Sequence, residues 1–145
     1  MGAVTDYASR KMLQSLFIPD AHSYIAEFDG NTWSGDFYVA LAKTAPILGT
    51  GAASLSEPTA SSYARAKYGI GSSYWQVINH SAVANTRSIY FNAPAEDWGI
   101  ISGWALCTAL TDGEVIAHGA LDPVRIIKGS IVNIHANGLV ISVVS

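Results

Sequence analysis

Four histidines and one cysteine are the residues of this chain that could bind a metal ion. They are His22, His80, His118, His135 and Cys107. Zinc sites draw their ligands at short, characteristic spacings, and no two of these residues lie at such a spacing. His118 and His135 fall inside expected strands, and Cys107 falls inside an apolar run, where a small buried thiol is the ordinary interpretation. The sequence therefore predicts neither a metal site nor a bound cofactor.

The carboxylates are no better placed for acid–base catalysis. Glu96 and Asp97 are adjacent, and neighbours in an extended chain point to opposite faces, which prevents them from sharing a proton. Glu27 and Asp29 would share a face, but beside an expected turn, where Asp has a conformational role. No serine occupies the G-x-S-x-G elbow of hydrolases. We therefore expect that the chain is not an enzyme.

The charge content points away from nucleic acid and membrane. Net charge is −3, and the few lysines and arginines are scattered singly, whereas a nucleic-acid partner calls for a basic patch or stripe. No run approaches the roughly 18 apolar residues of a membrane span. The N-terminus lacks the pattern of a signal peptide, and a single cysteine permits no internal disulfide, which is typical of a reducing cytosol.

The low charge content favours assembly with other protein chains. Half of the 145 residues are hydrophobic and 13% are charged, against about 25% in an ordinary soluble domain. A surface with so few charges is explained if another protein covers part of it. A compact monomer whose surface is rich in Ser, Thr and Asn is the alternative. We expect self-association as a homo-oligomer, binding to a larger protein lattice, or both.

The first segment is the one expected helix. Residues 4–17 place apolar side chains on one stripe at helical spacing, Thr5 can cap the start, and Pro19 ends the run. This stripe packs either on the chain's own domain or on a neighbouring subunit. Trp33, near an expected hairpin turn, could contact a partner protein or a sugar. The candidate partner-contact residues are Met12, Leu13, Leu16, Phe17 and Trp33.

After Pro19 the hydrophobic period changes from about 3.6 to 2, as strands require. Residues 36–42 form a near-continuous apolar strand, which predicts burial on both faces, and a long loop follows over residues 43–63. Asp112-Gly113 predicts a hairpin between strands 98–110 and 114–121. Asn137-Gly138 predicts another between 130–136 and 139–144. Pro123 is expected to open a further short strand.

Eight or nine short strands at even spacing predict an all-β protein. The expected architecture is a jelly-roll-like β-sandwich of about eight strands with a short N-terminal amphipathic helix. Residues 1–20 would form the helical arm, and residues 21–145 the β-sandwich domain.

Several strands and turns resemble a set of small virion proteins of tailed bacteriophages. The resemblance rests on a YVAL strand at residues 38–41, a YAR strand at 63–65, and a later series of short motifs. That series comprises Phe91 and Ala93, Trp98-Gly99, Gly119-Ala120-Leu121, Gly129, and Leu139 with Ile141. It covers residues 36–144, while Thr111-Asp112-Gly113 replaces the usual paired glycines and the loop at 43–62 is long.

The resemblance implies a structural protein of the virion, assembled in the host cytoplasm. Proteins of this set are described as tail-fibre-like, and similar β-sandwiches decorate heads as cement proteins. The leading expectation is a decoration protein that bridges neighbouring major capsid subunits, because the chain is small and has no shaft-like repeat. The alternative is a tail-fibre or receptor-binding module that contacts host-surface glycans. An unrelated lectin-like or enzymatic sandwich would need a site that the sequence lacks.

Overall fold

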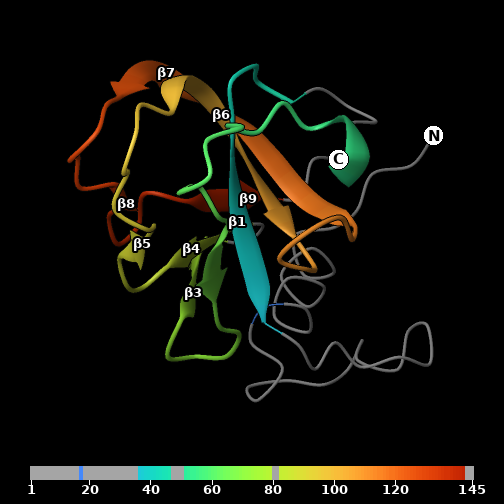
Figure 1. The fold of residues 1–145 in the computed structure, drawn as a ribbon. Helices are drawn as coiled ribbons and strands as arrows, with labels where there is room; N and C mark the ends of the chain where they lie inside the picture. The colour runs from blue at the N-terminus through green and yellow to red at the C-terminus, as the bar shows by residue number, and fades with distance from the viewer. Residues whose placement is uncertain (1–16, 18–35, 47–50, 80–81, 143–145) are drawn as a thin grey trace. The chain divides into compact units, whose positions relative to one another are not determined.

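A computed structural model describes residues 17, 36–46, 51–79 and 82–142, which carry nine β-strands (Figure 1). Helical structure within these ranges is limited to Phe17 and the 3-10 turn η1 (Ala52–Ser54). The chain divides into two compact units, each built from separate stretches of sequence. Unit 1 comprises Met1–Gly35, Gly69–Ser88 and Ile134–Ser145, and unit 2 comprises Asp36–Tyr68 and Ile89–Asn133.

Unit 2 is organised around a four-stranded antiparallel sheet of order β2-β1-β6-β7. Its strands are β1 (Phe37–Ala42), β2 (Ala66–Tyr68), β6 (Gly99–Cys107) and β7 (Val115–Ile126). β1 lies between β2 and β6, with Tyr38 opposite Cys107 and Ala42 opposite Gly103. Five of the six β1 residues are buried. The prediction of a strand covered on both faces is confirmed, because a central strand without charges needs such cover.

The β6–β7 hairpin forms as predicted. Asp112 and Gly113 both have positive φ, at 54° and 74°, which is the backbone conformation that Asp-Gly favours in a tight turn. β7 then continues through Pro123 to Ile126, where the sequence suggested a separate strand. A shift in register between Ile101 and Gly103 admits the extra β7 residues. Pro123 is tolerated because β7 is an edge strand and Pro has no N–H to donate.

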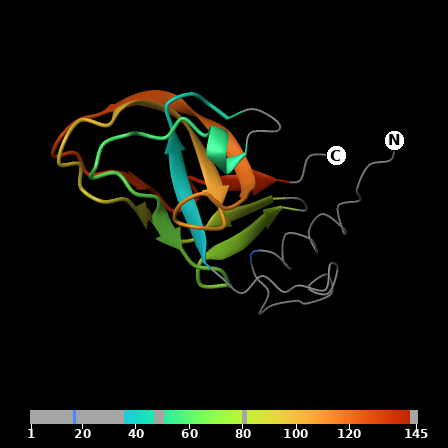
Figure 2. The ribbon, with the colours of Figure 1, turned by 45° about the vertical axis from the view of Figure 1, so that its right-hand side comes forward.

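The long loop after β1 packs over the sheet. Gly103 of β6 lies directly beneath it, since a Cβ built on Gly103 would come within 2.6 Å of Pro46 Cδ. Leu55 packs against the buried cluster of Ala40, Ala105 and Cys107. Figures 1 and 2 show η1 beside this part of the sheet. The described part of the loop is therefore a cover for the core.

Unit 1 contains a three-stranded sheet of order β3-β4-β9. Its strands are β3 (Trp75–Asn79), β4 (Ala82–Asn85) and β9 (Val140–Ser142). All four β4 residues are buried, although this short Ala-Val-Ala-Asn run gave no strand signal in the sequence. Trp75 is also buried, and its indole donates to the Gly69 carbonyl at 2.9 Å.

The predicted C-terminal hairpin is wrong. A turn does form at Asn137-Gly138, but β8 (Asn133–Ile134) pairs with β5 (Ile89–Tyr90), and β9 pairs with β4. β4 is the central strand of its sheet and needs a neighbour on both sides, which β9 supplies through Val83 opposite Ile141. The expected cover on both faces of β9 is also wrong, because Ile141 is buried but Val140 is 46% exposed.

The turn itself uses its two residues differently from the prediction. Asn137 adopts the left-handed conformation, with φ of 64°, and Gly138 does not. Gly138 is required for space, since a Cβ there would lie 2.8 Å from the His135 carbonyl oxygen. A side chain at this position would therefore clash with the backbone of the preceding turn.

Asn85 is the polar centre of unit 1. It is fully buried, and its Nδ2 donates to the carbonyls of Arg87 at 2.7 Å and His135 at 2.9 Å. Its Oδ1 accepts the Leu139 N–H at 2.9 Å. One side chain thus satisfies three backbone groups at the point where β9 begins.

The all-β fold class is confirmed by nine strands, whose pairings are antiparallel, and this content is consistent with a β-sandwich. The expected helix at residues 4–17 lies outside the described residues apart from Phe17, which is helical. The boundary expected at residue 20 lies outside them too, so the arm-and-domain division stays a prediction.

Replacing Asn85 tests its role in unit 1. Asn85→Ala leaves three buried backbone groups without a partner, and we expect a loss of about 2–4 kcal/mol in the free energy of unfolding, measured by urea denaturation. Gln76→Ala is the matched control, because Gln76 also donates its side-chain amide to this segment, at Asn137, but from an exposed position. Equal losses in the two variants would contradict the assignment.

Candidate functional site

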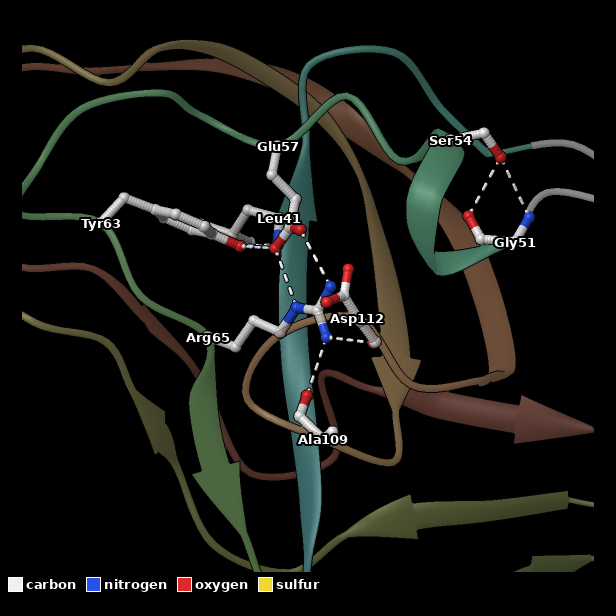
Figure 3. A network of polar contacts seen from close by, with 8 residues as sticks. All are labelled: Leu41, Gly51, Ser54, Glu57, Tyr63, Arg65, Ala109 and Asp112. Atoms are coloured by element: carbon white, nitrogen blue, oxygen red, sulfur yellow. Dashed lines mark hydrogen bonds and ion pairs between the residues drawn. The ribbon is translucent and has the colours of Figure 1, made fainter.

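The most extensive polar network of unit 2 centres on Arg65 (Figure 3). The side chain is only 3% exposed and forms a two-pronged ion pair with Glu57. Its Nε donates to Glu57 Oε1 and its Nη2 to Glu57 Oε2, both at 3.0 Å. A planar guanidinium suits this geometry because its donors match the two carboxylate oxygens.

The remaining prong of Arg65 binds the β6–β7 turn. Nη1 donates to the carbonyl of Ala109 at 2.7 Å and to that of Asp112 at 2.9 Å. Burial works against the charged guanidinium, but the hydrogen bonds from Glu57 outweigh it and raise the pKa of Arg65 above its ordinary value. Arg65 is thus a permanent cation that joins the covering loop to the hairpin turn.

Tyr63 completes the network on the side of β1. Its hydroxyl donates to Glu57 Oε1 at 2.6 Å and accepts the Leu41 N–H at 3.0 Å. Burial, followed by the hydrogen bond to Glu57, raises the pKa of the Tyr63 hydroxyl. The YAR motif therefore places two adjacent polar side chains on one carboxylate, which explains why strand β2 begins only at Ala66.

A second network joins the same loop to the segment before β6. Ser62 donates its N–H to Glu96 Oε1 at 2.9 Å, and its hydroxyl oxygen accepts the Trp98 indole N–H at 3.0 Å. The Trp98 ring meets Tyr63 edge to face, with centroids 5.3 Å apart. The hydrogen bond from the Ser62 N–H is the main cause that lowers the pKa of Glu96.

The adjacent carboxylates Glu96 and Asp97 bind different partners, as the sequence predicted. Glu96 accepts hydrogen bonds from Ser61 and Ser62, while Asp97 Oδ1 accepts the Lys128 N–H at 2.8 Å. Each carboxylate holds a loop in place, so this pair has the arrangement of structural groups.

The described residues offer no grouping for metal chemistry. Among them, no three His, Cys, Asp or Glu residues lie together as metal ligands would. His118 lies on β7 and His135 lies in the turn before Asn137, so the two belong to different units. Burial raises the pKa of the Cys107 thiol, which favours an unreactive core residue. No helix in the described part of the chain is long and apolar enough to span a membrane.

The surface of unit 2 is the remaining candidate for function. It carries large apolar side chains that are roughly half exposed or more, with Ile131 the most exposed at 87%. These residues are Tyr90, Ile100, Leu110, Val124, Ile127 and Ile131. Exposed apolar groups that recur over one unit are typical of a protein-binding surface.

The structure places one of the five predicted partner-contact residues. Phe17 is buried and packs edge to face against Trp75, with ring centroids 4.7 Å apart, and its carbonyl accepts the Gly71 N–H at 2.7 Å. Phe17 therefore lies in the core of unit 1. Met12, Leu13, Leu16 and Trp33 lie outside the described residues, and partner contact stays a prediction for the set.

Sequence reasoning did not identify the roles of Glu57, Asn85 or Arg65. A single arginine in an otherwise apolar strand segment was the available signal for Arg65, because a buried cation must have a partner. The carbonyls that it binds are 44 and 47 residues away in the sequence. A separation of that size leaves no local pattern.

The contribution of the Arg65 network can be measured with Arg65→Lys. Lysine keeps the charge but cannot bind both Glu57 oxygens and both turn carbonyls at once, so we expect a loss of about 2–4 kcal/mol in the free energy of unfolding. Lys67→Gln is the control, since Lys67 is 65% exposed and pairs with Asp36 at the surface, where such pairs contribute below about 1 kcal/mol. A loss for Arg65→Lys no larger than that of the control would refute the role.

Tyr63→Phe tests the raised pKa. The unfolded chain releases the tyrosine proton from about pH 10, whereas the folded chain retains it because the folded pKa is higher. The stability that Tyr63 contributes is therefore present below pH 10 and declines above it. We expect parent and variant to differ by about 1–3 kcal/mol at pH 7, and the gap to narrow in urea titrations above pH 10. A gap independent of pH would contradict the assignment.

Comparison with known proteins identifies the family. A family model described as Podophage GP4 fiber I protein gp80 matches residues 3–142, which is nearly the whole chain. A search of the curated proteins finds no match. The family match agrees with the resemblance of the YVAL and YAR strands to virion proteins of tailed phages. The chain therefore belongs to the podophage fibre protein family represented by GP4 fiber I protein gp80, and it is a structural protein of the bacteriophage virion.

Proposed function

We propose that the chain is a non-catalytic subunit of a virion fibre and acts by binding other protein chains of the particle. The observation that carries the proposal is the match of residues 3–142 to a podophage fibre protein model. A match of this extent includes both units and both polar networks. Assembly would take place in the host cytoplasm, as for other virion parts, without a nucleic-acid or membrane partner.

The geometry supports a binding role in two ways. The polar groups of the Arg65 network bind one another or the backbone, so their hydrogen-bonding capacity maintains the fold. The outward apolar side chains of unit 2, such as Ile131 and Tyr90, are instead available for contact with a neighbour. A chain with 13% charged residues gains by burying such a surface.

Head decoration is the second candidate. Its support is the size of the chain, 145 residues without the repeat of a fibre shaft. In that role the chain would bind the outer face of the head and bridge major capsid subunits. Under the fibre proposal the tip could contact host-surface glycans, for which Trp33 is the sequence-based candidate.

Location and copy number on the particle distinguish these functions. Purified virions are labelled with gold-conjugated Fab fragments raised against the chain and imaged by electron microscopy. In parallel, quantitative mass spectrometry measures the ratio of this chain to the major capsid protein. The fibre proposal predicts label on fibres and a small ratio, because only a few fibres project from one particle.

Label over the head surface, with a ratio of the chain to the major capsid protein approaching unity, would establish decoration instead. Absence of the chain from washed virions would overturn both functions. An unrelated Fab conjugate controls for non-specific labelling, and the portal protein provides an internal standard of low copy number for the mass spectrometry.

A further inference from the structure

The outer edge of β7 is a long sheet edge with few obstacles to pairing. β7 has 12 residues and ends the sheet of order β2-β1-β6-β7. Among the described residues, β6 is the strand that pairs with it, and no strand pairs on its other side. Figure 1 shows β7 running along the rim of the sheet beside β6. An edge of this kind presents unpaired backbone N–H and C=O groups, whose natural ligand is another extended strand.

The two halves of β7 differ in how they are protected. The second half holds Asp122, Pro123 and Arg125 together with the shift in register, which are features that discourage indiscriminate edge-to-edge pairing. The first half, residues 115–121, has neither proline nor an acidic or basic residue apart from His118. An unprotected half next to a protected half favours one defined partner over open-ended stacking.

The faces of β7 follow from its register with β6. His118, Ala120 and Val124 lie opposite Ala105, Gly103 and Ile101, which alternate along one face of β6. Those three β7 residues therefore share a face, and by alternation Ile116 and Asp122 share it too. Ala120, Asp122 and Val124 are exposed there.

This face is complementary to itself when two copies of the strand run antiparallel. A two-fold axis normal to the sheet keeps every side chain on its own face, so only residues of one face can lie opposite each other. With the axis at Ala120, His118 lies opposite Asp122 of the second copy, and Ile116 lies opposite Val124. Both ends of the strand therefore gain one polar pair and one apolar pair, and the small Ala120 side chains meet at the centre.

The neighbouring registers on this face are less favourable. An axis at His118 would place Glu114 opposite Asp122 of the second copy, and an axis at Asp122 would place the two Asp122 carboxylates together. Both arrangements set like charges directly opposite each other, which destabilises a strand pair. The charges thus select the register centred on Ala120.

We propose that two copies of this chain pair through β7 in the antiparallel register centred on Ala120. The result is a continuous eight-stranded sheet that uses the long edge of both copies. Because the contact is closed by two-fold symmetry, it yields a dimer and no further sheet growth. The pairing is independent of whether a fibre or the head holds the chain.

Disulfide trapping tests the register. Ala120→Cys, made in a Cys107→Ala background, places the two introduced thiols directly across the axis, where antiparallel Cβ atoms lie about 4.5–5.5 Å apart. Mild oxidation should convert this variant largely to a covalent dimer on non-reducing gels. Val124→Cys in the same background is the control, since it is exposed on the same face but lies opposite Ile116. Equal cross-linking of the two variants would overturn the register.

Charge reversal tests the interface in solution with the purified chain. Asp122→Lys sets lysine against His118, and we expect sedimentation equilibrium to show a dimer dissociation constant raised by roughly tenfold or more, because two symmetric pairs are lost. The double variant His118→Asp/Asp122→Lys should recover most of the parent affinity. A parent chain that is monomeric at about 100 µM, or a double variant no tighter than the single one, would overturn the proposal. Neither result would alter the location of the chain on the virion.

Discussion

The buried charge of Arg65 is the constraint on which the organisation of unit 2 depends. A cation removed from water is costly unless every donor finds an acceptor. Here the guanidinium takes both oxygens of Glu57 and two carbonyls of the β6–β7 turn. The loop that carries Glu57 must therefore return to the sheet, and the turn must keep its shape. The loop in turn covers β1 and β6, so a polar requirement determines how the apolar core is closed.

Unit 1 solves a similar problem without charge. Asn85 is an amide with two donors and one acceptor directed at backbone groups of the C-terminal segment. An amide can serve carbonyl and N–H groups together, which neither Asp nor Leu can do. Both units thus rely on one buried polar side chain that binds distant backbone. In each case the strand nearest to that side chain gains a fixed position: β9 beside Asn85, and the β6–β7 hairpin beside Arg65.

Local signals in the sequence were sufficient for the features that depend on neighbours along the chain. The apolar run at residues 36–42 predicted β1, and Asp112-Gly113 predicted the β6–β7 turn with its two positive φ angles. Pairings between distant segments were beyond such signals. Asn137-Gly138 predicted a hairpin, but β4 required a second neighbour and recruited β9. The site was predictable only as an absence of catalytic groupings, since the Arg65 contacts join residues more than forty positions apart.

The position of β1 in its sheet has a consequence for the order in which the protein folds. β6 and β7 are adjacent in sequence and can pair early as a local hairpin, whereas β1 must close a chain of more than sixty residues to reach β6. Ordering so long a segment delays the reward of the contact, which slows the formation of non-local sheets. During synthesis the ribosome would release β1 long before its partner emerges. The nascent chain would then expose this apolar strand, and a chaperone that shields it would raise the yield of particles.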